Sequence, residues 1–152
     1  MKYTLLIVLA FVTSSAWSQA LFKYDYKDCQ PEDMCMYCGD TAARPTVKLT
    51  KYLQKKLNRA QFEYNGRGQK MLFQVYIDVS GKLCVISVDD RHENAALRKD
   101  LRLELNNMPL WTPATQNGHP INSGMILEFT FYRDYFDIRY ISKRTMSDGR
   151  VI

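Results

Sequence analysis

The sequence predicts one small α+β domain, a two-layer sandwich in which two helices cover one face of a small antiparallel sheet of about three strands. Three observations carry this prediction. Apolar residues alternate through Met71–Val79 and again through Ser123–Tyr132, as in strands with one buried face. Leu97, Leu101 and Leu105 recur every four residues, as in an amphipathic helix.

Residues 1–20 have the pattern of a secretory signal peptide. Lys2 precedes the apolar run Leu5–Val12, and the small residues Ser18 and Ala20 favour cleavage after Ala20, with Ala16 as the second choice. The run is shorter than the roughly 20 apolar residues of a membrane-spanning helix. We therefore expect an exported, periplasmic protein without stable membrane insertion.

Residues 21–45 form a polar, cysteine-rich N-terminal arm that Pro31, Gly39 and Pro45 interrupt, so we expect it to lack regular structure. Disulfides are the default for cysteines in an exported chain. The candidates are Cys29, Cys35, Cys38 and Cys84.

Four cysteines allow three pairings, and the sequence does not choose among them. Cys35 and Cys38 can close a tight loop. Equally, Cys29 can pair with one of these two while the other reaches Cys84, which would fasten the arm to the sheet.

The domain itself is expected over residues 46–141. Apolar residues at helical spacing predict a first helix from Val47 to Asn58, with lysines on its remaining face and Thr46 as N-cap. Met71–Val79 and Lys82–Val88 then form a hairpin around Ser80–Gly81. On the returning strand, alternation places Cys84, Ile86 and Val88 on one face, opposite Leu83 and Val85.

A second helix is expected over residues 95–106, with Asn94 as its cap. Met108–Pro113 follows as an extended segment, and Trp111 is expected to pack at the edge of the core. Asn117–Gly118 forms a turn into a third strand, Ser123–Tyr132. Residues 135–141 either prolong this strand or form a fourth, and residues 142–152 are a polar tail expected to be mobile. The sheet face opposite the helices, with Tyr76, Glu128 and Thr130, is expected to meet water or a partner.

These segments, in this order, resemble the C-terminal domain of the TonB family, bacterial proteins that reach outer-membrane receptors from the periplasm. The segments are Val47–Asn58, Val75–Val88, Asn107–Ala114, Gln116–Pro120 and Met125–Phe131. The structural anchors within them are Gly81, Pro109, Trp111, Pro113 and Gly118.

The resemblance implies a protein-binding domain that engages an envelope protein, such as an outer-membrane receptor in transmembrane transport. In the family, an extended receptor segment adds beside the terminal strand. That position corresponds here to Ser123–Arg133, with Met125, Leu127, Phe129, Phe131 and Arg133 as partner-strand candidates. The chain departs from energy-transducing members because a cleaved signal and a short arm are expected instead of a membrane anchor and a proline-rich spacer. Energy transduction is therefore not expected.

The sequence does not predict an enzyme, a cofactor or nucleic-acid binding. His92 lies in an acidic turn that suits a helix start, and His119 lies in another turn without a nucleophile. The alternative function is a small secreted thiol-redox or metal-binding protein that uses Cys35 and Cys38, which have the spacing of a redox pair. A homodimer formed through sheet edges is a third hypothesis.

Overall fold

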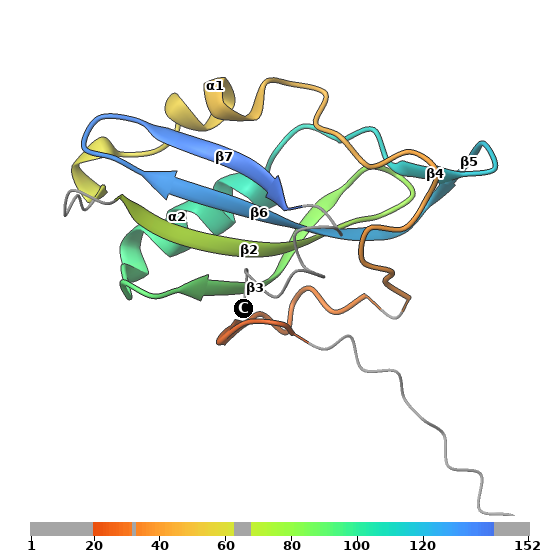
Figure 1. Cartoon of the computed structure of the whole chain (residues 1–152), viewed down its shortest axis with the longest axis horizontal. Helices are drawn as coiled ribbons and strands as arrows, with labels where there is room; N and C mark the ends of the chain where they lie inside the picture. Colours follow the sequence, from red (N-terminus) through yellow and green to blue (C-terminus); the bar gives the residue numbers. More distant parts are fainter. Residues whose placement is uncertain (1–19, 32, 63–67, 142–152) are drawn as a thin grey trace, which may run out of the picture.

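The structure is a computed structural model that describes residues 20–31, 33–62 and 68–141 (Figure 1). The expected signal peptide up to residue 19 and the expected mobile tail, residues 142–152, lie outside the described residues. The helices are α1 (Leu49–Gln54), the 3-10 helix η1 (Arg59–Gln61) and α2 (Ala95–Asn106). The strands are β1 (Tyr24–Asp25), β2 (Gln69–Ile77), β3 (Leu83–Asp90), β4 (Ala114–Gln116), β5 (His119–Ile121), β6 (Ser123–Phe131) and β7 (Phe136–Ile141).

The main sheet is antiparallel and has five strands in the order β1-β3-β2-β6-β7. The α+β prediction is confirmed, but the expected number of about three strands is too small. The arm adds β1 beside β3, and the ambiguous residues after β6 form a separate strand, β7. A four-residue loop separates β6 from β7, and in it Tyr132 and Tyr135 stack with their ring centroids 4.5 Å apart. A further hairpin, β4–β5, stands apart from this sheet.

Both helices pack on one face of the sheet. Leu49 and Leu53 of α1 and the leucines of α2 belong to one buried cluster with Phe73 and Phe129, whose rings lie 5.2 Å apart. Figure 1 shows α2 behind β2 and β6, and α1 next to β7. Each buried leucine or phenylalanine contributes about 1.5–3 kcal/mol, so this apolar layer is the main stabilising element.

The β2–β3 hairpin forms around the expected turn, but one predicted face is wrong. Pairing shifts between Gln74 and Val75, which lie opposite Ser87 and Val85, so Ile86 is the extra residue of a β-bulge. The bulge reverses the alternation beyond it. Val88 consequently joins Leu83 and Val85 in the main core and does not share the face of Cys84.

The second helix matches its predicted bounds, and the Asn94 side chain accepts a hydrogen bond from the Leu97 N–H at 3.2 Å. The first helix is shorter than expected. Its N-cap is Lys48 rather than Thr46, whose hydroxyl instead donates to the Leu110 carbonyl at 2.7 Å. Thr46 thus fastens the chain before α1 to the extended segment after α2.

The arm lies over the sheet face opposite the helices. Phe22 and Met36 pack against a second buried cluster that contains Leu72, Ile126 and Ile141. Thr130, which the sequence places on an open face, is only 8% exposed. Through Phe22 and Met36, the protein's own N-terminal arm covers part of the face expected to meet water or a partner.

Candidate functional site

Strand β6 is not an edge strand, so the partner-strand position expected at Ser123–Arg133 is wrong. It pairs along its whole length with β2 and, from Ile126 to Phe131, with β7. An internal strand has no free backbone groups for a foreign strand. Four of the candidate side chains are buried in the core: Met125, Leu127, Phe129 and Phe131. The fifth, Arg133, is exposed in the loop before β7.

The start of β6 is paired with the arm, where β7 no longer reaches. The Gly124 N–H donates to the Cys35 carbonyl at 2.9 Å, and the Tyr37 N–H donates to the Gly124 carbonyl at 2.8 Å. A disulfide joins Cys35 to Cys38 and closes the loop around this contact. A Cβ at Gly124 would lie 2.6 Å from the Met36 sulfur and 2.7 Å from the Met34 sulfur, so both methionine side chains of the arm pack directly against this glycine.

The second disulfide joins Cys29 to Cys84 on β3. Disulfide formation is thus confirmed for all four cysteines. The observed pairing contains the tight Cys35–Cys38 loop and also a bond that fastens the arm to the sheet. Cys29 makes the bond to Cys84, whereas the expected arrangement used Cys35 or Cys38 for it. Two disulfides indicate an oxidising compartment outside the cytoplasm.

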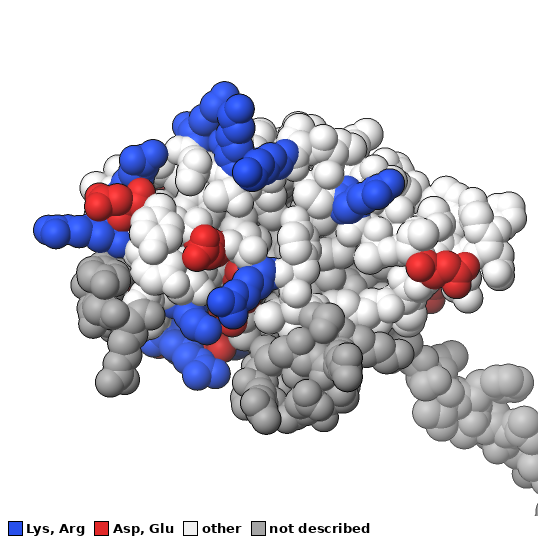
Figure 2. Space-filling model, turned by 45° about the horizontal axis from the view of Figure 1, so that its top comes forward, with Lys and Arg blue, Asp and Glu red and all other residues white. Residues whose placement is uncertain are grey.

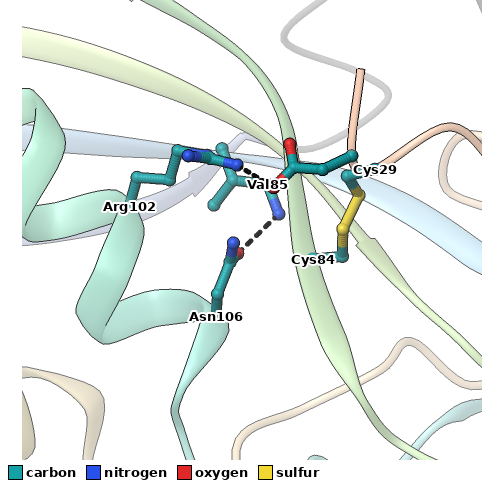
Figure 3. Close-up of a disulfide and its surroundings, with 6 residues drawn as sticks. Cys29, Cys84, Val85, Arg102 and Asn106 are labelled. Carbon is teal, nitrogen blue, oxygen red and sulfur yellow. Dashed lines mark hydrogen bonds and ion pairs between the residues drawn. A yellow bond between two sulfur atoms is a disulfide. The ribbon is translucent and has the colours of Figure 1, made fainter. Parts of the chain in front are cut away.

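The β3 edge of the sheet is closed by several contacts (Figure 3). Strand β1 covers Ser87 and Val88, and the Asn106 side chain of α2 accepts a hydrogen bond from the Val85 N–H at 2.9 Å. Arg102, also on α2, pairs with Asp28 of the arm. Figure 3 shows Arg102 and Asn106 reaching toward β3 beside the disulfide.

Two arginine–tyrosine stacks hold the arm against α2. The Arg98 guanidinium lies 3.6 Å from the centre of the Tyr24 ring, and the Arg102 guanidinium lies 3.9 Å from that of Tyr26. The two tyrosines are two residues apart on an extended chain, and the two arginines are four residues apart on a helix. Both spacings correspond to about 6 Å, so each arginine lies level with its tyrosine. Arg98 also bonds the buried Asp90 carboxylate at 2.7 Å.

The other edge of the sheet, β7, has no strand partner on its outer side among the described residues. Its side chains alternate: Phe136 and Ile138 face the helices, and Asp137 and Arg139 are exposed on the other face. Neither charged side chain makes an ion pair with another residue in the described part of the chain. This edge has unpaired backbone groups available for another strand.

Basic side chains flank this region on the helix side. Figure 2 shows a group of Lys and Arg side chains at the top of the molecule and further ones at its left and lower left, around a broad surface of uncharged residues. The exposed lysines on and beside α1 are Lys48, Lys51, Lys55 and Lys56.

A mostly apolar pocket of about 450 Å³ opens where β7 ends. Burial raises the pKa of Tyr37, which lines it, to about 12, and burial also raises the pKa of Tyr140. Both phenols are therefore neutral at physiological pH. The lining residues are Tyr37, Ala42, Ala43, Arg44, Pro45, Met125, Tyr140 and Ile141.

The glycine and tryptophan anchors meet at one point. Gly81 has a φ of +87°, and a Cβ there would lie 2.0 Å from the Trp111 carbonyl oxygen. The Trp111 N–H donates to the Gly81 carbonyl at 2.7 Å, and the indole is buried in the main core. Glycine at position 81 thus allows the positive φ of the turn and also the close approach of the segment that carries Trp111.

Around this turn, the Asp78 carboxylate accepts hydrogen bonds from the Ser80 N–H at 2.8 Å and the Lys82 N–H at 2.9 Å. Burial alone would raise the pKa of Asp78, but hydrogen bonds from Ser80, Lys82 and Gly81 outweigh it and hold this pKa below its ordinary value. An ionised Asp78 therefore stabilises the turn.

The remaining sequence-predicted residues lie apart from β7. Pro109 is exposed and Pro113 is half-buried on either side of Trp111. Asn117 and Gly118 both have positive φ in the β4–β5 turn, as a two-residue hairpin loop requires. His119 is exposed in β5, and His92 is exposed before α2.

Across the described ranges 20–31, 33–62 and 68–141, no group of three or more His, Cys, Asp or Glu side chains is placed to hold a metal ion. Within the same ranges, no helix is long and apolar enough to cross a membrane. Comparison of the chain with protein-family models, curated proteins and solved structures finds no match.

Proposed function

We propose that this protein is an exported periplasmic binding domain that takes up an extended segment of another envelope protein as an additional strand along β7. The observation that carries the proposal is the contrast between the two edges of the sheet. The β3 edge is closed by β1, a disulfide and the Asn106 side chain, whereas the outer edge of β7 has no strand partner among the described residues.

In strand addition, backbone hydrogen bonds supply affinity and side-chain pockets supply selectivity. The pocket beside Tyr140 and Ile141 lies at the end of β7, where a side chain of an added strand can enter it. Its apolar lining favours an aliphatic or aromatic side chain, since burial of such a group contributes about 1.5–3 kcal/mol. We therefore expect a partner segment with an apolar residue at this position.

The expected class of partner comes from the resemblance to the TonB C-terminal domain. Supporting it are the order of strand, strand, helix and strand in β2, β3, α2 and β6, and the placement of both helices on one sheet face. On this basis the partner is an outer-membrane receptor or a related envelope protein. Energy transduction forms no part of the proposal.

Site-specific photo-crosslinking tests the proposal. A photoreactive amino acid replaces Arg139 on β7 in one strain and Asp25 on β1 in a second, because both side chains are exposed on edge strands. We expect an envelope protein crosslinked at position 139 and absent at position 25. Equal crosslinking at both positions, or none at 139, contradicts binding along β7.

The alternative function is thiol-redox or metal chemistry at Cys35 and Cys38. Its supporting observation is the exposure of Cys35 in a disulfide that closes a short loop. Against it, the backbone of the same loop is hydrogen-bonded to Gly124 of β6, which gives the disulfide a structural task. Redox titration separates the two: a bond that resists physiological dithiols is structural, whereas one that exchanges readily supports redox activity.

A further inference from the structure

The outer edge of β7 is complementary to itself in one register. Two copies of an edge strand can pair antiparallel about a two-fold axis perpendicular to the sheet, and the helices of both copies then lie on the same side. Directly opposed residues in such a pair have side chains on the same face, whereas neighbouring residues of one strand have them on opposite faces. The two-fold axis must therefore pass midway between one residue of β7 and the same residue of the second copy, which is called here an axis through that residue. This condition leaves few registers for a strand of six residues.

The charges on β7 distinguish these registers. An axis through Asp137 would oppose two aspartates, and an axis through Arg139 would oppose two arginines. Like charges directly opposed destabilise a strand pair. An axis through Tyr140 would place Arg139 opposite the uncharged Ile141 and would leave Asp137 without a counterpart within β7, so the overlap of the two strands would be shorter.

An axis through Ile138 satisfies every position. Asp137 of each copy then lies opposite Arg139 of the other, which forms two cross-strand pairs of opposite charge. On the helix face, Ile138 meets its own copy and Phe136 meets Tyr140. Tyr140 is 49% exposed, so it has apolar surface left to bury against a second chain.

We propose that this chain forms a two-fold homodimer by antiparallel pairing of β7 centred on Ile138, which joins the two five-stranded sheets into one. Asp137 and Arg139 have no ion-pair partner among the described residues, so the second copy supplies one for each. The pairing occupies the edge that the proposed function assigns to a foreign strand. Self-association and partner binding would then exclude each other.

This inference uses the same free edge as the proposed function, but it needs no foreign partner. Purified protein is enough to test it, so failure of the dimer leaves the crosslinking test untouched, and the reverse also holds. Because the paired strands are short, we expect a micromolar dissociation constant or weaker.

Charge reversal tests the register. Asp137→Arg carries arginine at both charged positions of β7, and Arg139→Asp carries aspartate at both. Each single variant should repel its own copy and weaken the dimer by roughly tenfold or more in sedimentation equilibrium, since two pairs change sign. The double variant D137R/R139D should recover the dimer, because its pairs are again opposite in charge.

A mixture of the two single variants provides the most decisive test of the register. In the register centred on Ile138, an Asp137→Arg chain is complementary to an Arg139→Asp chain, so an equimolar mixture should form a heterodimer at concentrations where each variant alone is mostly monomeric. Asp25→Arg on β1 makes the same charge change on the opposite edge and should leave the dimer unchanged. Circular dichroism checks that each variant is folded.

The inference is overturned if the unmodified protein stays monomeric up to about a millimolar concentration. It is also overturned if the single reversals leave the dimer intact, or if neither the double variant nor the mixture restores association. Association that Asp25→Arg weakens as much as Asp137→Arg would place the interface elsewhere.

Discussion

Replacing Gly81 by alanine should destabilise the fold far more than the same change at Gly118. Both glycines occupy hairpin turns with similar positive φ, +87° and +79°. They differ in their surroundings: a Cβ at residue 81 would lie 2.0 Å from the Trp111 carbonyl oxygen, whereas nothing lies within 4 Å of one at residue 118. The pair therefore separates the cost of backbone strain from the cost of displacing Trp111.

The magnitude follows from three contributions. Alanine in the left-handed region costs about 1–2 kcal/mol at either position. At residue 81, moving the Trp111 carbonyl away also breaks the 2.7 Å hydrogen bond from the Trp111 N–H, which contributes about 1 kcal/mol. Displacing the buried indole adds about 1–3 kcal/mol. We expect a loss of about 3–6 kcal/mol for Gly81→Ala and about 1–2 kcal/mol for Gly118→Ala.

Urea unfolding of the chain without residues 1–20 measures both losses. Trp111 is then the sole tryptophan and reports directly on the affected segment. The linear dependence on urea gives each free energy of unfolding, and unchanged slopes show that the comparison is valid. Equal losses for the two variants would refute the packing of Trp111 against the turn.

Three further outcomes are expected. Removing the Cys29–Cys84 disulfide, with a sequence separation of 55, should lower the free energy of unfolding by about 4 kcal/mol in urea unfolding. Removing Cys35–Cys38, with a separation of 3, should lower it by about 2 kcal/mol, because the closed loop is shorter. The reverse order of the two losses would contradict this connectivity of the arm. Because burial raises the pKa of Tyr37 from 10.0 to about 12, its neutral form stabilises the fold below pH 10, and this contribution is lost between about pH 10 and 12. Tyr37→Phe should lessen that alkaline loss by on the order of 1 kcal/mol, given that the side chain is half-buried; identical pH profiles would refute the assignment. Asn106→Ala should cost about 1–2 kcal/mol and speed exchange of the Val85 amide in NMR, since that N–H loses its acceptor; unchanged exchange would contradict closure of the β3 edge.

Local patterns in the sequence predicted the elements that local interactions determine. The helix over residues 95–106 follows from its leucine spacing and its Asn94 cap, and the structure has the same bounds. The turns at Gly81 and Asn117–Gly118 follow from residues that tolerate positive φ.

The errors came from features that depend on distant contacts. The bulge at Ile86 leaves no mark in the alternation, so the alternation predicts the wrong face for Val88. Strand β1 has two residues and is held by a disulfide and by stacking on α2. The Tyr132–Tyr135 turn lacks glycine, so the sequence leaves open whether the residues after it form a separate strand, and it places the partner strand beside β6 instead of β7.

Residue-resolved hydrogen exchange in dilute solution tests the open β7 edge most directly. In an antiparallel edge strand, alternate amides point away from the sheet. The account predicts that alternate amides from Phe136 to Ile141 exchange at nearly unprotected rates, whereas their neighbours and the Val85 amide of β3 are slow. Uniform protection along β7 in the dilute monomer, or a fast Val85 amide, would contradict it.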